Sequence, residues 1–271
     1  MQLKNKHILL TGATGGIGKH LALMLARKGA NLALAGRDAN KLQALADEII
    51  SKGGNAVVVV ADFSQPNIAQ QVIAETNKKL GSIDVLINNA GILDFIRLED
   101  QTPQQIEQTI QTNVTALIQL TQAALPQFKA ANQGHYVMVG SILGSLGFPY
   151  YATYCASKFA VHGFSQALRR ELIDTRIGVT YVAPRTVNTP MNDANTLAML
   201  AKTGGNLDEP DKVAAIVVSA LEAEKQEVFI GQPESFFAWL NGVAPKLVNF
   251  GLKKQANLAR EFAVRKSKSI S

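Results

Sequence analysis

Three residues near the middle of the chain have side chains suited to carbonyl or alcohol chemistry. Ser141 follows a strand-like run at residues 135–140, and Tyr154 and Lys158 lie four residues apart in a segment with helical character. Residues at positions i and i+4 share one face of a helix, so we expect the phenol of Tyr154 and the ammonium of Lys158 to lie side by side.

An adjacent positive charge would make this phenol useful for proton transfer. Tyrosine has an ordinary pKa of about 10, and a nearby ammonium lowers that pKa by favouring the phenolate. We therefore expect Lys158 to lower the pKa of Tyr154, while the Ser141 hydroxyl binds a substrate oxygen. Such a reaction needs a hydride carrier. An isolated Tyr–Lys pair is more often plain helix surface, so the interpretation depends on the upstream sequence.

A glycine-rich segment, T-G-A-T-G-G-I-G at residues 11–18, lies between a strand-like run at 8–10 and a helix predicted over 17–28. Glycines let the backbone turn tightly and approach a pyrophosphate, whose charge is met by the helix N-terminus. A glycine cluster is often only a turn, but at the start of alternating strands and helices it predicts a dinucleotide site. The residues expected to line this site are Gly12, Thr14, Gly15, Gly16, Ile17 and Gly18.

Strand-like and helix-like segments alternate along the rest of the chain. Further strands are predicted at 31–35, 56–60, 84–87, 178–182 and 227–230, and further helices at 39–51, 67–80 and 208–223. This alternation predicts an α/β fold with a doubly wound parallel sheet, the Rossmann type, over residues 1–233. Several strands are unbroken apolar runs, as expected when helices cover both faces of a sheet.

The composition favours a soluble globular enzyme of one domain. The 271 residues are 47% hydrophobic and 18% charged, which argues against disorder. The single cysteine, Cys155, excludes an internal disulfide, and the four histidines lack the spacing of metal ligands, so we expect no metal. The apolar run at residues 7–10 has no cleavage site after it, so we expect a cytoplasmic protein.

The net charge of +6 is concentrated at one end of the chain. Residues 246–271 hold seven of the 27 Lys and Arg residues and one acid, Glu261, whereas residues 1–245 are balanced. A basic tail implies an acidic contact surface or simple solvation. The body of the protein therefore gives no reason to expect a nucleic-acid partner.

Five motifs in order resemble the short-chain dehydrogenase/reductase family over about residues 5–231. They are T-G-x-x-x-G-x-G at 11–18, N-N-A-G at 88–91, Asn113, Ser141, and Y-x-x-x-K at 154–158. The glycine loop also satisfies the G-x-x-G-x-x-G pattern of the longer, epimerase-like branch. Chain length, N-N-A-G and the Y-C-A-S-K context favour the short, single-domain oxidoreductase branch.

The resemblance implies a catalytic role for each of four residues. Tyr154 would donate or accept the proton, Lys158 would also bind the nicotinamide ribose, and Ser141 would position the substrate oxygen. Asn113 would hold a water that links the lysine to solvent. From the residues alone, Asn113 lies inside a long helix that is predicted to begin after Thr102 and to reach residue 125, where it would occupy a solvated face.

The resemblance also implies the remaining cofactor contacts. Asp62 would contact the adenine, and the further contacts would be Asn89, Ala90, Gly91, Tyr154, Lys158, Pro184, Val187 and Thr189. The family pattern after the strand at 178–182 is P-G-x-x-x-T. Arg185 replaces its glycine, which leaves open how the nicotinamide amide is held.

The second strand ends in Gly36 and Arg37, which bears on the choice of cofactor. An acid near this point binds the ribose 2′-hydroxyl of NAD, whereas an arginine accommodates a 2′-phosphate. Gly36 occupies the usual acid position and Arg37 follows it, so NADP(H) is favoured. The alternative is that Arg37 only caps the end of the strand.

A segment at about residues 186–206 resembles the substrate lid of the family. It offers Met191, Leu197, Met199 and Leu200, which suit an apolar, lipid-like substrate. The expected substrate contacts are Ser141, Leu143, Phe148 and Met191.

The C-terminal extension, residues 234–271, has an apolar stripe at helical spacing. The stripe comprises Phe236, Leu240, Val243, Leu247 and Phe250, with Trp239 adjacent. Two interpretations stay open. The extension packs over the substrate pocket or a dimer mate, or it anchors the protein peripherally to an anionic membrane surface.

These observations predict an NADP(H)-dependent oxidoreductase that interconverts a ketone or aldehyde and an alcohol, as a homodimer or homotetramer. One alternative is a sensor or scaffold that binds NADP(H) without turnover. A second is an epimerase or dehydratase with bound nicotinamide.

Overall fold

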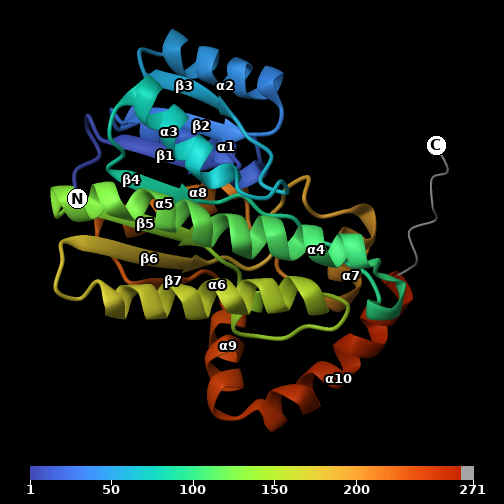
Figure 1. The fold of residues 1–271 in the computed structure, drawn as a ribbon. Helices are drawn as coiled ribbons and strands as arrows, with labels where there is room; N and C mark the ends of the chain where they lie inside the picture. Colours follow the sequence, from blue (N-terminus) through green and yellow to red (C-terminus); the bar gives the residue numbers. More distant parts are fainter. Residues whose placement is uncertain (264–271) are drawn as a thin grey trace.

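Seven parallel strands form one sheet through the centre of the molecule (Figure 1). The computed structural model describes residues 1–263. The sheet order is β3-β2-β1-β4-β5-β6-β7, which reverses direction between β1 and β4. The strands are β1 (His7–Thr11), β2 (Asn31–Gly36), β3 (Asn55–Val60), β4 (Val85–Asn88), β5 (Gly134–Val139), β6 (Ile177–Ala183) and β7 (Glu227–Phe229). The predicted doubly wound Rossmann fold is confirmed.

Helices cover both faces of this sheet and bury a separate apolar core on each side. One core contains residues of α1 (Gly16–Arg27), α2 (Ala39–Ser51) and α8 (Pro210–Glu222). The other contains residues of α3 (Ile68–Leu80), α5 (Ala116–Ala131) and α6 (Ala152–Glu171). The central strands are buried along their length, as their unbroken apolar sequences require.

The predicted long helix after Thr102 is interrupted by a π-helical turn. A capping box of Thr102 and Gln105 begins α4 (Pro103–Ile110), as predicted. The π-helical turn η2 (Gln111–Thr115) follows and leads into α5. Asn113 lies in this turn and is only 1% exposed. The alternative interpretation from the residues alone, a solvated helix face, is therefore wrong.

The C-terminal extension leaves the sheet after β7 as two helices. The backbone breaks at Ala244, between α9 (Glu234–Val243) and α10 (Pro245–Phe262). Figure 1 shows these helices, in red, forming a V beyond α6, with the end of α10 returning to α7 (Ala194–Thr203). Within residues 1–263, no helix has the length and apolar character needed to cross a membrane. Three cations of the basic tail, Arg265, Lys266 and Lys268, lie outside the described residues.

Candidate active site

A cavity of about 1050 Å³ opens at the carboxyl edge of the sheet, next to the point where the strand order reverses. Parallel α/β sheets bind ligands at this position. All of the predicted cofactor and substrate contacts line the cavity, whereas Asn113 lies behind its wall. We call the part beside residues 11–18 the glycine-loop side, and the part between α7, α9 and α10 the helical side.

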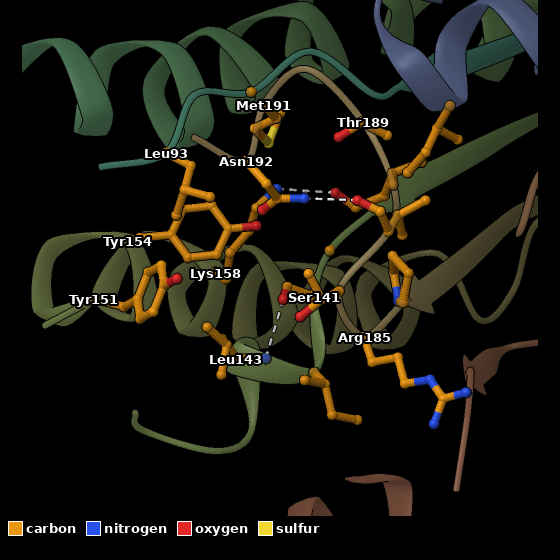
Figure 2. A pocket seen from close by; sticks show the side chains of 18 of the residues that line it. Leu93, Ser141, Leu143, Tyr151, Tyr154, Lys158, Arg185, Thr189, Met191 and Asn192 are labelled. Atoms are coloured by element: carbon orange, nitrogen blue, oxygen red, sulfur yellow. Dashed lines mark hydrogen bonds between the residues drawn. The ribbon is translucent and has the colours of Figure 1, made fainter. Parts of the chain in front are cut away.

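Ser141, Tyr154 and Lys158 meet where these two sides join (Figure 2). Ser141 follows β5, and its Oγ accepts a hydrogen bond from the Leu143 amide at 3.1 Å. Tyr154 and Lys158 lie on α6, with the lysine Nζ 5.7 Å from the centre of the tyrosine ring. The lysine also donates to the carbonyl oxygen of Val139 at 3.1 Å. The predicted i, i+4 pairing of phenol and ammonium is thus present in the structure.

Tyr181 of β6 supports the backbone at Ser141, a role that the sequence analysis missed. Its hydroxyl donates to the Ser141 carbonyl oxygen at 3.1 Å. A Cβ at Gly140 would lie 2.3 Å from the Tyr181 ring, and one at Gly144 would lie 2.6 Å from its hydroxyl. Glycines at these two positions therefore let Tyr181 lie beneath the turn that presents Ser141. A buried tyrosine in an apolar strand carries no local signal for this contact.

The protonation of Tyr154 differs from the expectation drawn from the sequence. Desolvation by the surrounding protein raises the pKa of Tyr154 to about 12, and hydrogen bonding to Ser141 lowers it by less. Burial lowers the pKa of Lys158 to about 8. The expected lowering of the Tyr154 pKa by Lys158 is therefore wrong for the protein alone, because desolvation dominates. Near neutral pH, Tyr154 carries a proton that it can donate.

Asn113 connects the loop after β4 to helix α6. Its Oδ1 accepts from the Ile92 amide at 2.8 Å, and its Nδ2 donates to the Ile92 carbonyl oxygen at 2.9 Å. The same Nδ2 donates to Ser157 Oγ at 3.0 Å, and Ser157 donates to the Tyr154 carbonyl oxygen at 2.7 Å. The Asn113 side chain thus positions the turn of α6 that carries Tyr154 and Lys158.

The N-N-A-G motif holds the glycine loop in place. Thr11 Oγ1 accepts hydrogen bonds from the amides of Asn89 and Ala90 at 2.9 and 3.0 Å. The Asn89 side chain donates to the carbonyl oxygens of Thr11 and Gly12, both at 3.1 Å. Gly12 has a φ of +62°, and a Cβ there would lie 2.9 Å from the Ala90 Cα. This approach explains why the loop needs glycine at that position.

The start of α1 offers a site for an anionic group. Within the described part of the chain, no side chain caps the α1 N-terminus at Gly15, and the first turn contains no acid. A Cβ on Gly16 would lie 2.3 Å from Thr189 Cγ2, so only glycine lets these two segments approach so closely. Uncapped amides at a helix N-terminus bind pyrophosphates, so these residues fit a dinucleotide.

Arg37 and Asp62 lie farther along the glycine-loop side. Arg37 is exposed at the end of β2 and lines the cavity. Burial would raise the pKa of Asp62, but two hydrogen bonds from Ser64 and the charge of Arg37 together lower it. Asp62 therefore stays ionised, and the guanidinium of Arg37 lies near enough to act on its charge.

Comparison with known proteins matches residues 6–199 to the model of the short chain dehydrogenase family. The chain belongs to this family. A relative from Bos taurus, "Dehydrogenase/reductase SDR family member 7B", is 31% identical over 90% of this chain and 79% of its own length. The Vibrio cholerae 3-oxoacyl-[acyl-carrier-protein] reductase FabG is 30% identical over 88% of this chain and 94% of its own length.

Two solved structures share the fold of this short chain dehydrogenase. One, from Burkholderia cenocepacia in complex with NADP, has a TM-score of 0.77 and 30% identity, covering 87% of this chain and 100% of its own. The other, from Burkholderia phymatum in complex with NAD, has a TM-score of 0.82 and 21% identity, covering 91% and 96%. At that lower identity, the second likeness concerns the fold alone.

Most residues that line the helical side of the cavity were not predicted from the sequence to contact the substrate. From the lid segment, Met191, Met199 and Leu200 line the cavity, whereas Leu197 does not. The other apolar residues on this side are Leu93, Tyr151, Phe237, Leu240, Leu247, Val248 and Leu252. The inner faces of α9 and α10 thus cover the cavity, as in the packing interpretation. Their amphipathic pattern alone was also compatible with packing on a dimer mate or with a membrane anchor.

Arg185 links Asp208, which lies just after the lid segment, to Glu234 at the start of α9. Its Nε and Nη2 donate to the Asp208 carboxylate at 3.0 and 2.8 Å, and its Nη1 donates to Glu234 at 3.0 Å. The hydrogen bonds to Asp208 and Glu234 outweigh desolvation and raise the pKa of Arg185. Asn206 also donates to Glu234, at 2.8 Å. Figure 2 shows the Arg185 side chain pointing away from Ser141 and Tyr154, so this departure from the family pattern serves the helical side.

Proposed function

We propose that this short chain dehydrogenase is an NADP(H)-dependent oxidoreductase that interconverts an apolar, lipid-like ketone or aldehyde and its alcohol. The observation that carries the proposal is the meeting of Ser141, Tyr154 and Lys158 at the junction of the two sides of one cavity. A dinucleotide on the glycine-loop side and a carbonyl compound on the helical side would both reach these three residues.

Each of these residues has a role that its surroundings support. The nicotinamide would supply or accept the hydride. Ser141 Oγ would hold the substrate oxygen, and Tyr154, with its raised pKa, would donate a proton to that oxygen during reduction. Lys158 would bind the ribose and stabilise the phenolate that remains. Asn113 would hold the water that returns a proton through Lys158.

The preference for NADP(H) rests on Gly36 and Arg37. An arginine after the second strand suits a 2′-phosphate, and Gly36 offers no carboxylate for a 2′-hydroxyl, while the nearby Asp38 accepts a hydrogen bond from the Lys41 amide as the N-cap of α2. The Burkholderia cenocepacia relative, at 30% identity, was solved in complex with NADP, which agrees with this choice.

The apolar substrate class rests on the wall of the helical side. Met191, Met199 and Leu240 are among the apolar residues there, and Leu143 and Phe148 continue that wall toward Ser141. The FabG relative is named as a 3-oxoacyl-[acyl-carrier-protein] reductase, so its substrate contains an acyl chain with a ketone. We propose further that residues 1–233 form the catalytic domain, that residues 234–271 form an extension, and that the protein is a cytoplasmic homodimer or homotetramer.

The test is turnover of NADPH with a panel of ketones and aldehydes. Tyr154→Phe removes the proton donor and should lower kcat by about 10³-fold, within the usual range for general acid–base catalysis. NADPH affinity should stay nearly unchanged, because the ring is retained. If Tyr154→Phe keeps most of its rate, this assignment is wrong.

The same panel separates the two alternatives. Catalysis without net NADPH consumption would indicate an epimerase or dehydratase. NADPH binding without turnover of any compound would indicate a sensor or scaffold.

A further inference from the structure

The outer faces of α9 and α10 expose an apolar surface that lies largely outside the cavity. It comprises Phe236, Trp239, Val243, Leu247 and Phe250, which we call the α9–α10 apolar face. Trp239 is 63% exposed and Phe250 is 84% exposed. The rings of Phe236 and Trp239 lie 5.8 Å apart, centre to centre, so the aromatic residues form one cluster on α9. Soluble monomers rarely expose contiguous apolar patches that have no interaction role.

This face is continuous with the mouth of the cavity. Leu247 is 65% exposed and also lines the helical side, and Phe237 is 42% exposed and does the same. An apolar molecule moving between the α9–α10 apolar face and Tyr154 would therefore pass along apolar side chains. In Figure 1 the V of α9 and α10 projects from the body of the protein, so both outer faces are accessible.

Cations surround the apolar face on α10. Lys246 precedes Phe250 by four residues, and Lys253 and Lys254 follow it by three and four, so all three lysines share its side of the helix. All three are exposed. The sequence contains no Asp or Glu between Glu234 and Glu261. The face thus combines exposed aromatic rings with an uncompensated positive charge.

We propose that the α9–α10 apolar face docks on an anionic lipid membrane, from which the apolar substrate enters the cavity. The lysines favour this occupant over a second copy of the chain, since two such faces would bring like charges together. Exposed aromatic rings beside lysines are typical of helices that lie in the membrane interface. The docking stands on its own evidence, whereas the entry of substrate rests on the proposed function.

The first experiment measures co-sedimentation of the full chain with phosphatidylcholine vesicles that contain or lack phosphatidylglycerol. The expected result is binding to the anionic vesicles that weakens as salt rises, because salt screens the lysines. Replacing three lysines, by Lys246→Gln, Lys253→Gln and Lys254→Gln, should weaken it by about 100-fold. The matched control removes three exposed lysines elsewhere, by Lys78→Gln, Lys129→Gln and Lys212→Gln, and should retain most of the binding.

The apolar contribution is tested with Trp239→Ser and Phe250→Ser together. Neither side chain lines the cavity, so turnover of a short, water-soluble ketone should not change. Binding to anionic vesicles should fall by at least about tenfold, because two aromatic rings lose their burial in lipid. Ile173→Ser, at an isolated exposed position in the loop after α6, is the control and should bind as the parent chain does.

Several results would overturn the proposal. One is absence of binding to anionic vesicles, and another is equal binding by the face variants and their controls. The third result has two parts: the parent protein does not bind vesicles, and the Trp239 and Phe250 substitutions convert a dimer to a monomer. This result would show that the α9–α10 apolar face is a contact between copies of the chain. Turnover of the soluble ketone without vesicle binding would leave the proposed function intact. Vesicle binding without turnover of any carbonyl compound would support docking and overturn the function.

Discussion

The glycine-loop side of the cavity is held mainly by hydrogen bonds to its backbone, whereas the helical side is held by side chains from distant segments. On the first side, Thr11 and Asn89 fix the loop, and close approaches at Gly12 and Gly16 leave no room for larger residues. On the second, Arg185 joins Asp208 to Glu234, and apolar residues of α7 and α10 pack together. Nucleotide binding and substrate selection should therefore respond to different substitutions.

Gly16→Val should act mainly on the glycine-loop side, and of the three substitutions Gly16→Val, Arg185→Ala and Arg37→Ala it has the largest expected effect. Its Cβ would lie 2.3 Å from Thr189 Cγ2, so the segment after β6 would be forced out of place. We expect NADPH affinity to fall by about 100-fold, equivalent to an overpacking cost of about 3 kcal/mol. Isothermal titration calorimetry measures this loss.

The matched control is Gly163→Ala on the exposed side of α6. Among the described residues, nothing lies within 4 Å of a Cβ there. This change should leave NADPH affinity unaltered and stabilise the helix by up to about 1 kcal/mol. Equal loss of affinity in both variants would contradict the role given to Gly16.

Arg185→Ala should break the helical side alone. It leaves the carboxylates of Asp208 and Glu234 without their arginine, and breaking a fully buried pair costs roughly 3–5 kcal/mol. Because the Arg185 side chain is 16% exposed, we expect a smaller loss, about 2 kcal/mol in the free energy of unfolding. The KM for an apolar ketone should rise, and NADPH affinity should change little.

Denaturant unfolding and steady-state kinetics test this separation. Arg170→Ala, at an exposed position on α6, serves as the control and should change neither property. A large loss of NADPH affinity in Arg185→Ala would mean that the two sides are coupled through the loop after β6.

Arg37→Ala should change the choice of cofactor without disturbing the wall of either side. A charge-assisted hydrogen bond to a 2′-phosphate is about twice as strong as a neutral one, so NADPH affinity should fall by about tenfold. NADH affinity should stay nearly constant, since that cofactor lacks the phosphate. Arg27→Ala on α1 is the control. Equal losses for NADPH and NADH would show that Arg37 does not reach the 2′-phosphate.

The two sides also differ in how far their residues could be predicted. Residues 11–18 and 88–91 form short motifs at strand ends, and parallel strands bring all of their carboxyl ends to one edge of the sheet. Their assembly into one cavity follows from the fold class. The predicted substrate contacts Leu143, Phe148 and Met191 also line the cavity, but Phe237, Leu240 and Leu252 carried no motif that tied them to Tyr154.

The alternating strands and helices, the family, and the segments that carry Ser141, Tyr154 and Lys158 could all be predicted from the sequence. Local patterns suffice for these features, because side-chain periodicity and turn residues act within a few positions of the chain. Three features became evident only in the folded protein: Asn113 is buried in a π-helical turn, the pKa of Tyr154 is raised, and α9 and α10 cover the cavity. Desolvation and packing cause these features, and both depend on residues that are far apart in the sequence and meet only in the folded protein.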